Sequence, residues 1–99
     1  MMKVEQGPQG EMDIRLSGAF DWSLAARLEK CLGERAQAGP VTVDFTHVRG
    51  VDVAAAARAL VGVSGLKLCG LTRHLLRVLR YCGVETPPAR FLHEGEPRF

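Results

Sequence analysis

The stretch that determines the fold is VTVDFTHVRGVDVAAAARAL, residues 41–60. Its first five residues are mostly β-branched or aromatic and have the length of a strand. We expect a loop over residues 46–51 and then a helix over residues 53–60, because alanine has the highest intrinsic helix propensity. Asp52 stands where an N-cap would accept hydrogen bonds from the first free amides of that helix. The stretch therefore predicts a strand, a loop, and a helix whose small side chains let it lie close to a sheet.

The residues before this stretch predict a strand and a helix. Apolar and polar side chains alternate over residues 12–17, as in a half-buried strand, and Gly18 ends the pattern. From Asp21 the apolar positions follow the period of an amphipathic helix. The main apolar positions of this helix are Leu24, Leu28 and Leu32. Asp21 or Ser23 can cap the helix, and Gly39-Pro40 stops it, because proline cannot continue a helix.

The residues after this stretch predict one more strand and one more helix. Gly62 and Gly65 end the alanine-rich helix, and residues 66–69 have the pattern of a short strand. Thr72 can cap a third helix, and Gly83 fits the left-handed position just past its end. The buried face of this helix consists of Leu75, Leu76, Val78 and Leu79.

The order of these elements predicts an α/β fold. Strands that alternate with helices favour a mixed sheet with right-handed parallel crossovers. We expect a single domain with four to five strands and about three to four helices, formed by residues 11–92. Residues 1–10 would be an N-terminal segment that can hold a short edge strand, and residues 93–99 a flexible C-terminal tail. Near that end only Phe91-Leu92 look able to anchor the chain.

The composition fits one ordinary soluble domain. Of 99 residues, 46% are hydrophobic and 24% are charged, and the formal net charge of +2 is too near balance to indicate nucleic-acid binding. No apolar run approaches the roughly 18 residues that cross a bilayer. The first residues also lack the apolar segment of a secretion signal, so we expect a cytoplasmic protein. Three cysteines without C-x-x-C spacing indicate neither a disulfide framework nor a zinc site.

The central stretch and its surroundings resemble STAS domains, the family of bacterial anti-sigma-factor antagonists and of the cytoplasmic tails of sulphate transporters. The family pattern is a hydrophobic strand ending in Asp-Leu-Ser, a short loop, and then hydrophobic-Asp-Ser-Ser-Gly-Leu at the start of a helix. Asp44 and Asp52 match its two acidic positions. Residues 66–84 look like the family's following strand, helix and closing glycine. The resemblance covers about residues 12–92 and implies binding of other proteins rather than chemistry.

The residue after the second acidic position departs from the family pattern. In switchable antagonists it is a serine or threonine that a partner kinase phosphorylates, whereas this chain has Val53. Ala54 and Ala55 replace the next Ser-Gly, so the first turn of the helix has no hydroxyl. Val53 is therefore a degenerate phosphoacceptor position, and the module would not be switched by phosphate there. Asp52 would instead hold one fixed negative charge at the helix end, besides acting as a simple cap.

The resemblance implies that partners bind the predicted loop and the start of the alanine-rich helix. The expected partner-binding residues are Asp44, Thr46, His47, Asp52, Val53, Ala54 and Arg58. The first expected partner is an anti-sigma factor of the kinase type. The alternative is that the chain is the small cytoplasmic STAS subunit of a membrane lipid-transport ABC complex and binds its ATPase with the same surface. The sequence leaves the oligomeric state open.

No arrangement of residues in the sequence points to catalysis. We expect neither an enzyme nor a cofactor, because no acid, base or nucleophile constellation is visible. The three histidines are far apart and show no metal-ligand spacing, so we expect no metal site.

Two further features have alternative interpretations. Arg73, Arg77 and Arg80 fall on one stripe of the third helix. They either dock an acidic partner or, as the simpler interpretation has it, form a solvated helix face. Phe20 and Trp22 flank the start of the first helix. Either could be exposed as an interface anchor, although most such aromatic residues belong to the core or to the helix entry.

Overall fold

The computed structural model describes residues 1–34 and 39–85. Four strands and three helices occur within this part of the chain. In order they are β1 (Met2–Gln6), β2 (Met12–Phe20), α1 (Trp22–Gly33), β3 (Val41–Val51), α2 (Val53–Leu60), β4 (Leu66–Cys69) and α3 (Arg73–Tyr81). The prediction of an α/β fold with a mixed sheet is confirmed.

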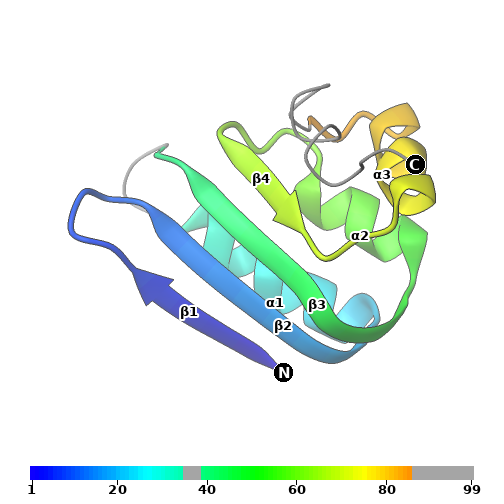
Figure 1. The fold of residues 1–99 in the computed structure, drawn as a ribbon, viewed down its shortest axis with the longest axis horizontal. Helices are drawn as coiled ribbons and strands as arrows, with labels where there is room; N and C mark the ends of the chain where they lie inside the picture. Colours follow the sequence, from blue (N-terminus) through cyan, green and yellow to red (C-terminus); the bar gives the residue numbers. More distant parts are fainter. Residues whose placement is uncertain (35–38, 86–99) are drawn as a thin grey trace.

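The strands form one sheet in the order β1-β2-β3-β4 (Figure 1). β1 pairs antiparallel with β2, whereas β2, β3 and β4 run parallel to one another. Met12, Val41 and Leu66 are partners at the starts of the three parallel strands. The carboxyl ends of these strands therefore face the same edge of the sheet, and the helices that follow β2 and β3 begin at that edge.

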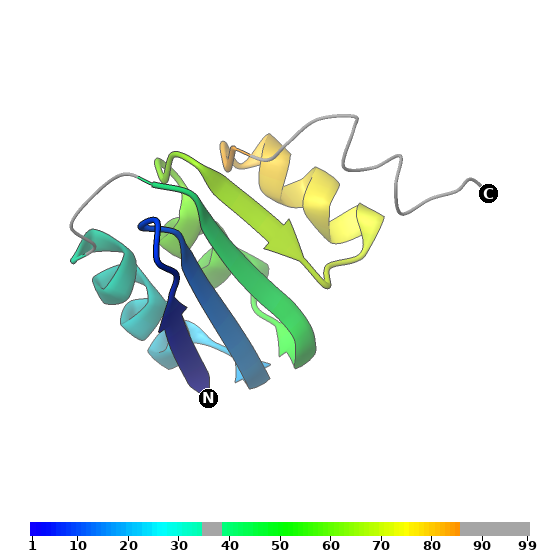
Figure 2. The ribbon, with the colours of Figure 1, turned by 60° about the vertical axis from the view of Figure 1, so that its left-hand side comes forward.

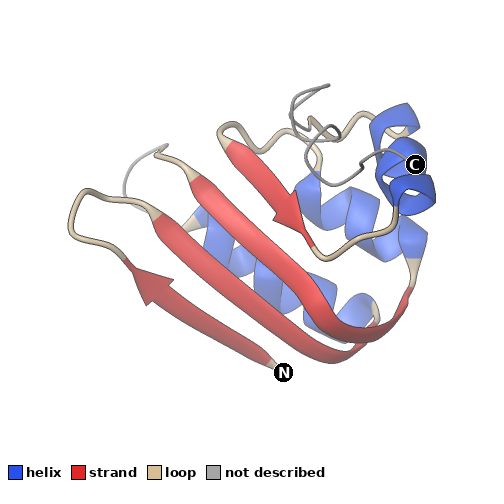
Figure 3. Ribbon diagram, viewed as in Figure 1, coloured by secondary structure: helices blue, strands red, loops and turns tan. Residues whose placement is uncertain are grey.

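Helices α1 and α2 cover one face of the sheet, and α3 packs against α2 at the β4 end of the molecule (Figure 2). Figure 3 shows α1 and α2 behind the strands, while the front face of the sheet is not covered by any described helix. The strands explain this layering, because their side chains alternate between the two faces. Buried positions on β2 and β3 are Met12, Ile14, Leu16, Val41, Val43 and Phe45, and the residues between them are polar.

The core lies between the sheet and α1 and α2. Phe20 and Phe45 are both 1% exposed, and their ring centroids lie 5.4 Å apart. Ala55, Ala56 and Ala59 bring α2 close to the sheet, since each is at most 3% exposed and has only a methyl side chain. Burial of a large aliphatic or aromatic side chain contributes about 1.5–3 kcal/mol, so this layer supplies most of the driving force for folding.

The prediction of a loop over residues 46–51 is wrong, because β3 continues to Val51. This half of β3 pairs in parallel with the second half of β2, from Ser17↔His47 to Phe20↔Val51. β2 likewise does not end at Gly18, which adopts a positive φ of 83° beside one of two register shifts in this pairing. Each strand segment supplies hydrogen-bond partners for the other, which a pattern of local propensities does not reveal.

Each of the three helices begins at a predicted cap, and of the two candidates for α1 the cap is Asp21. The side chains of Asp21, Asp52 and Thr72 accept hydrogen bonds from the amides of residues 24, 55 and 75. α1 ends at Gly33, before the predicted stop at Gly39-Pro40. Glycine has a low helix propensity, and the Glu34 amide closes the last turn on the carbonyls of Lys30 and Cys31. Gly83 has the expected positive φ, 95°.

Some predictions fall outside the described residues. These are the flexible tail over residues 93–99 and the anchoring role of Phe91-Leu92. None of the helices within residues 1–34 and 39–85 has the length and apolar character needed to span a membrane.

Candidate partner-binding site

Asp52 forms the junction between β3 and α2. One of its carboxylate oxygens accepts a hydrogen bond from the Ala55 amide at 3.2 Å, and its own amide donates to the Phe20 carbonyl at 2.9 Å. The first bond caps α2, and the second fastens the start of α2 to the end of β2. Asp52 is itself exposed, so its negative charge remains at the surface.

The first turn of α2 presents small and apolar groups. Val53, at the position where the family pattern has a hydroxyl, is half-buried and packs against the core. Ala54 is exposed, whereas Ala55 is fully buried. Solvent at this turn therefore meets the Asp52 carboxylate and the Ala54 methyl group, and the first turn of α2 offers no side-chain hydroxyl.

Asp44 and Thr46 are joined by two local hydrogen bonds within β3. The Thr46 amide donates to the Asp44 carboxylate at 2.9 Å, and the Thr46 hydroxyl donates to the same oxygen. The two hydrogen bonds lower the pKa of Asp44 from its ordinary value, the hydroxyl having the larger effect, because both stabilise the charged form. The charges of His47 and Arg15 act on this pKa in the same direction.

The structure places the expected site residues in separate regions. In the sheet register Asp44 is paired with Arg15 on β2 and Cys69 on β4. Since its neighbours Val43 and Phe45 are buried, Asp44 belongs to the opposite face of the sheet. Asp52 lies eight positions further along this extended chain, which corresponds to roughly 25 Å at the usual rise of a strand. Thr46 and His47 are exposed on β3 near Asp44. Only Asp52, Val53 and Ala54 form a compact group, at the start of α2.

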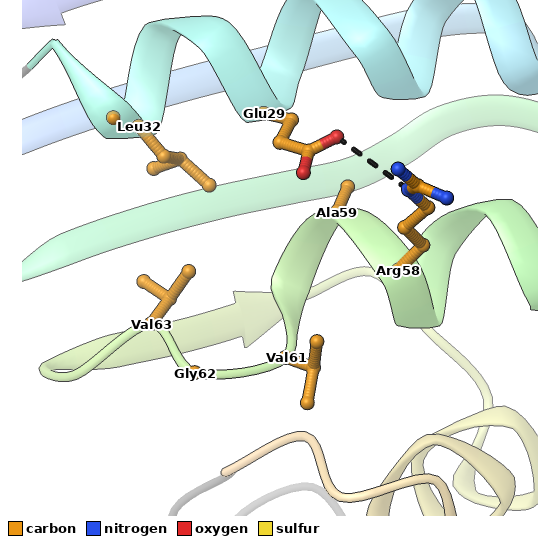
Figure 4. A pocket seen from close by; sticks show the side chains of 8 residues that line it. Glu29, Leu32, Arg58, Ala59, Val61, Gly62 and Val63 are labelled. Atoms are coloured by element: carbon orange, nitrogen blue, oxygen red, sulfur yellow. Dashed lines mark ion pairs between the residues drawn. The ribbon is translucent and has the colours of Figure 1, made fainter.

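Arg58 lies in a third region, between α1 and α2. Its Nε is 4.0 Å from a carboxylate oxygen of Glu29 on α1 (Figure 4). Both side chains are largely exposed, so the ion pair contributes little to stability. It stands over a groove of about 270 Å³. The groove is lined by Glu29, Leu32, Gly33, Arg58, Ala59, Val61, Gly62 and Val63.

Trp22 is a surface residue that the sequence pattern did not assign to the site. It is 51% exposed at the start of α1, whereas its neighbour Phe20 is a core residue at 1%. Of the two interpretations considered for these aromatic residues, Phe20 follows the core interpretation and Trp22 does not. Periodicity cannot separate them, because both flank the same junction between strand and helix.

The arginine stripe on α3 is also at the surface. Arg73, Arg77 and Arg80 are exposed, and the latter two line a shallow pocket of about 420 Å³ with Tyr81. Within the described part of the chain, no three His, Cys, Asp or Glu side chains gather as a metal site would require.

Comparison with known proteins places the chain in a family. The family described as "Mlab, STAS domain" matches residues 4–93. The chain belongs to the STAS domains. A search of curated protein sequences finds no match.

Solved structures support the STAS fold. The anti-sigma factor antagonist SpoIIAA in its unphosphorylated form is 18% identical, with a TM-score of 0.58 over 90% of this chain and 89% of that chain. The Bacillus cell fate determinant SpoIIAA in its phosphorylated form is 16% identical, with a TM-score of 0.53 over 95% and 97%. At these identities the likeness concerns the fold. In this STAS domain, the group of Asp52, Val53 and Ala54 is the best-defined candidate site.

Proposed function

We propose that this STAS domain is a non-enzymatic protein-binding module whose binding surface centres on Asp52, Val53 and Ala54. The observation that carries the proposal is the first turn of α2, where an exposed carboxylate and methyl group stand beside a half-buried valine. These groups have no nucleophile or proton-transfer pair among them, but they offer a small, rigid and partly apolar contact surface. Asp44, Thr46 and His47 on β3 and Arg58 on α2 lie outside this surface.

Binding at this surface is constitutive with respect to phosphorylation of the α2 start. A phosphoryl group would bring about −1.5 to −2 charges to the helix end and could switch a partner off. Valine cannot accept it. The Asp52 carboxylate already occupies the Ala55 amide and supplies one permanent negative charge. The partner therefore meets the same charge at all times.

The first partner class is an anti-sigma factor of the kinase type, bound in the cytoplasm. The fold shared with SpoIIAA, an anti-sigma factor antagonist, supports this assignment. In this role the chain is an antagonist that the kinase cannot release by modifying the α2 start.

The second partner class is the ATPase of a membrane lipid-transport ABC complex, in which the chain is a small STAS subunit. A surface without a phosphoacceptor supports this role equally well, because a permanent subunit needs no release step. The two roles use the same surface and differ in the partner.

The test is affinity capture from native cells with tagged wild-type chain and two variants. Ala54→Arg adds a long cation to the exposed first turn of α2. Gln6→Arg, at the end of β1 paired with the start of β2, is the matched control at the opposite edge of the sheet. Capture of a kinase-type anti-sigma factor by wild type and Gln6→Arg but not by Ala54→Arg supports the first role, and capture of a transport ATPase in that pattern supports the second. Equal capture by all three chains contradicts the proposed surface.

Phosphorylation provides a second test. The purified chain is incubated with ATP and the kinase-type anti-sigma factor, and its intact mass is measured. We expect no mass increase, and Val53→Ser should restore a phosphorylation site at that position. Phosphate on another residue of the wild-type chain, such as Thr46, would refute the unswitched module.

A further inference from the structure

Trp22 is an exposed aromatic residue without an evident structural role. It is the chain's one tryptophan and half of its surface meets solvent, although its size would allow it to contribute strongly to a core. Interface hot spots are enriched in tryptophan, because its large rigid surface is buried at a small entropic cost. An exposed tryptophan such as Trp22 is therefore a candidate hot spot for partner binding.

The start of α1, where Trp22 stands, neighbours the start of α2. β2 and β3 are parallel and, after two register shifts, remain paired up to Phe20↔Val51. α1 and α2 begin two residues after these partners. The hydrogen bond from the Asp52 amide to the Phe20 carbonyl fastens the two junctions together. The helices then pack against each other along the same face of the sheet (Figure 1). Trp22 and Ala54 are thus exposed in neighbouring first turns at one edge of the molecule.

Two exposed carboxylates lie at the starts of these two helices. Helix N-termini ordinarily attract anions through their free amides and the helix dipole. Here each of the two is already capped by a carboxylate of the chain, Asp21 on the Leu24 amide and Asp52 on the Ala55 amide. Both aspartates are exposed. An incoming anion would therefore meet two fixed negative charges, whereas a cationic side chain would be attracted to both.

We infer that Trp22 is the anchor of the partner interface and inserts into an apolar pocket of the partner protein that Lys or Arg side chains surround. The inference rests on the proposed function and deepens it, since it extends the surface at Ala54 to α1 and specifies the chemistry of the partner. The apolar pocket takes the indole, and the cationic rim pairs with Asp21 and Asp52.

The free chain tests the local geometry, because all tryptophan fluorescence comes from Trp22. We expect quenching by acrylamide. With each quenching constant divided by that of N-acetyltryptophanamide in the same buffer, we expect a higher ratio for caesium than for iodide, since the two carboxylates attract the cation and repel the anion. Asp21→Asn keeps a capping side chain but removes one charge, and it should narrow the difference between the two ions. A ratio for iodide equal to or higher than that for caesium would overturn the inference.

Binding measurements test the anchor itself. The probes are the purified kinase-type anti-sigma factor and, separately, the purified transport ATPase of the same organism. For whichever of them binds wild type, Trp22→Ala should raise Kd by about 30-fold or more, the usual range of a hot spot. Tyr81→Ala on α3 is the matched control, as it truncates an exposed aromatic residue far from this edge, and it should change Kd by less than about 3-fold. Both variants should unfold within about 4 °C of wild type, because both side chains are exposed.

The outcomes separate the two proposals. Loss of binding in both Trp22→Ala and Ala54→Arg supports the anchor. Loss in Ala54→Arg alone overturns the anchor and leaves the proposed function in place. Unchanged binding in both variants, or no binding of wild type to either probe, refutes the proposed surface and the anchor that rests on it.

Discussion

Asp52 combines a structural and a surface role in one carboxylate. One of its oxygens accepts the hydrogen bond from the Ala55 amide, so removal of the carboxylate leaves that amide without its cap. Asp52→Ala should lower the free energy of unfolding by about 0.5–2 kcal/mol, whereas Asp52→Asn, which can still cap, should change it by a few tenths. Urea unfolding of both variants checks this expectation. If Asp52→Ala is as stable as wild type, the hydrogen bond from the Ala55 amide to Asp52 does not contribute to the free energy of unfolding.

Asp44 makes the stability of the fold depend on pH. The hydrogen bonds from Thr46 lower its pKa in the folded state, so the unfolded chain binds a proton at higher pH than the folded chain does. The resulting stabilisation is complete above the unfolded pKa, near 4, and is lost as the pH falls through the lower folded pKa. Thr46→Val removes the hydroxyl donor and should raise the pKa of Asp44 toward its ordinary value.

Carboxyl NMR titration of Asp44 measures this change directly. Thr42→Val is the matched control, because it makes the same substitution two residues before Asp44 and leaves both hydrogen bonds from Thr46 in place. An unchanged Asp44 pKa in Thr46→Val would show that the amide of residue 46 alone accounts for the shift.

At the scale of elements, the tight packing of α2 depends on its alanines. Ala56 is fully buried, whereas Ala54, two residues earlier, is exposed. Ala56→Leu should destabilise the fold by about 1–3 kcal/mol, because the larger side chain must push α2 away from the core. Ala54→Leu should lie within about 0.5 kcal/mol of wild type, as is usual for surface changes. Thermal unfolding of the pair measures the difference, and equal stabilities would mean that α2 does not pack closely on the sheet.

Gly70, just after β4, packs closely against Thr46 in the middle of β3. Gly70 has a φ of +81°, and a Cβ built there would lie 2.3 Å from the backbone nitrogen of Thr46. Gly70→Ala therefore combines a left-handed conformation, which costs roughly 1–2 kcal/mol in a residue with a Cβ, with a backbone clash. We expect a loss of more than about 2 kcal/mol together with a shift of the Asp44 pKa, because Thr46 must move.

Gly33→Ala is the control for this substitution. A Cβ at the end of α1 meets nothing within 4 Å, and alanine favours the helix over glycine. This variant should be as stable as wild type or more stable. If Gly70→Ala and Gly33→Ala unfold at the same urea concentration, the contact between Gly70 and Thr46 does not constrain β3.

At the scale of the whole molecule, the three thiols report on three regions of the fold. Cys31 is half-buried on α1, Cys69 is half-buried at the end of β4, and Cys82 is exposed after α3. Burial raises the pKa of the Cys31 and Cys69 thiols, and Glu34 and Asp44 respectively add to the effect. A raised pKa leaves less thiolate at neutral pH and slows reaction.

Cys82 should therefore react first with maleimide at neutral pH, and the rates at Cys31 and Cys69 should rise as the pH increases. Peptide mass spectrometry over a time course gives the order. The urea-unfolded chain is the control, since the differences between the three sites should largely disappear there. Faster labelling of Cys31 than of Cys82 in the folded chain would contradict the packing of α1.

The same molecular scale explains why the candidate site forms at one edge. In parallel sheets the carboxyl ends of neighbouring strands lie along the same edge, so the loops and helix starts that follow them also lie there. This arrangement brings the starts of α1 and α2 together, although Trp22 and Ala54 are 32 positions apart in the sequence. It also separates Asp44 from Asp52, because the chain between them is extended strand.

The amino-acid sequence by itself determined the elements and their order. Asp52 and Thr72 are predicted caps, and the cap of the first helix is narrowed to Asp21 or Ser23. The alternation in residues 12–17 predicts which face of that strand is buried. These signals are local, since a cap needs only amides three residues away and a strand shows its period within a few residues. The missing hydroxyl at Val53 could likewise be read from the sequence.

Only the tertiary structure decided the course of residues 46–51 and the exposure of Trp22. Residues 46–51 are strand because β2 lies beside them and supplies the other half of a hydrogen-bonded ladder. Phe20 is buried because it lies in the core between the sheet and the helices, whereas Trp22 lies outside this core and is exposed. The ion pair of Arg58 with Glu29 forms because α1 packs beside α2. Each of these features requires contact between residues distant in the chain, and a pattern of local propensities contains no information on such contacts.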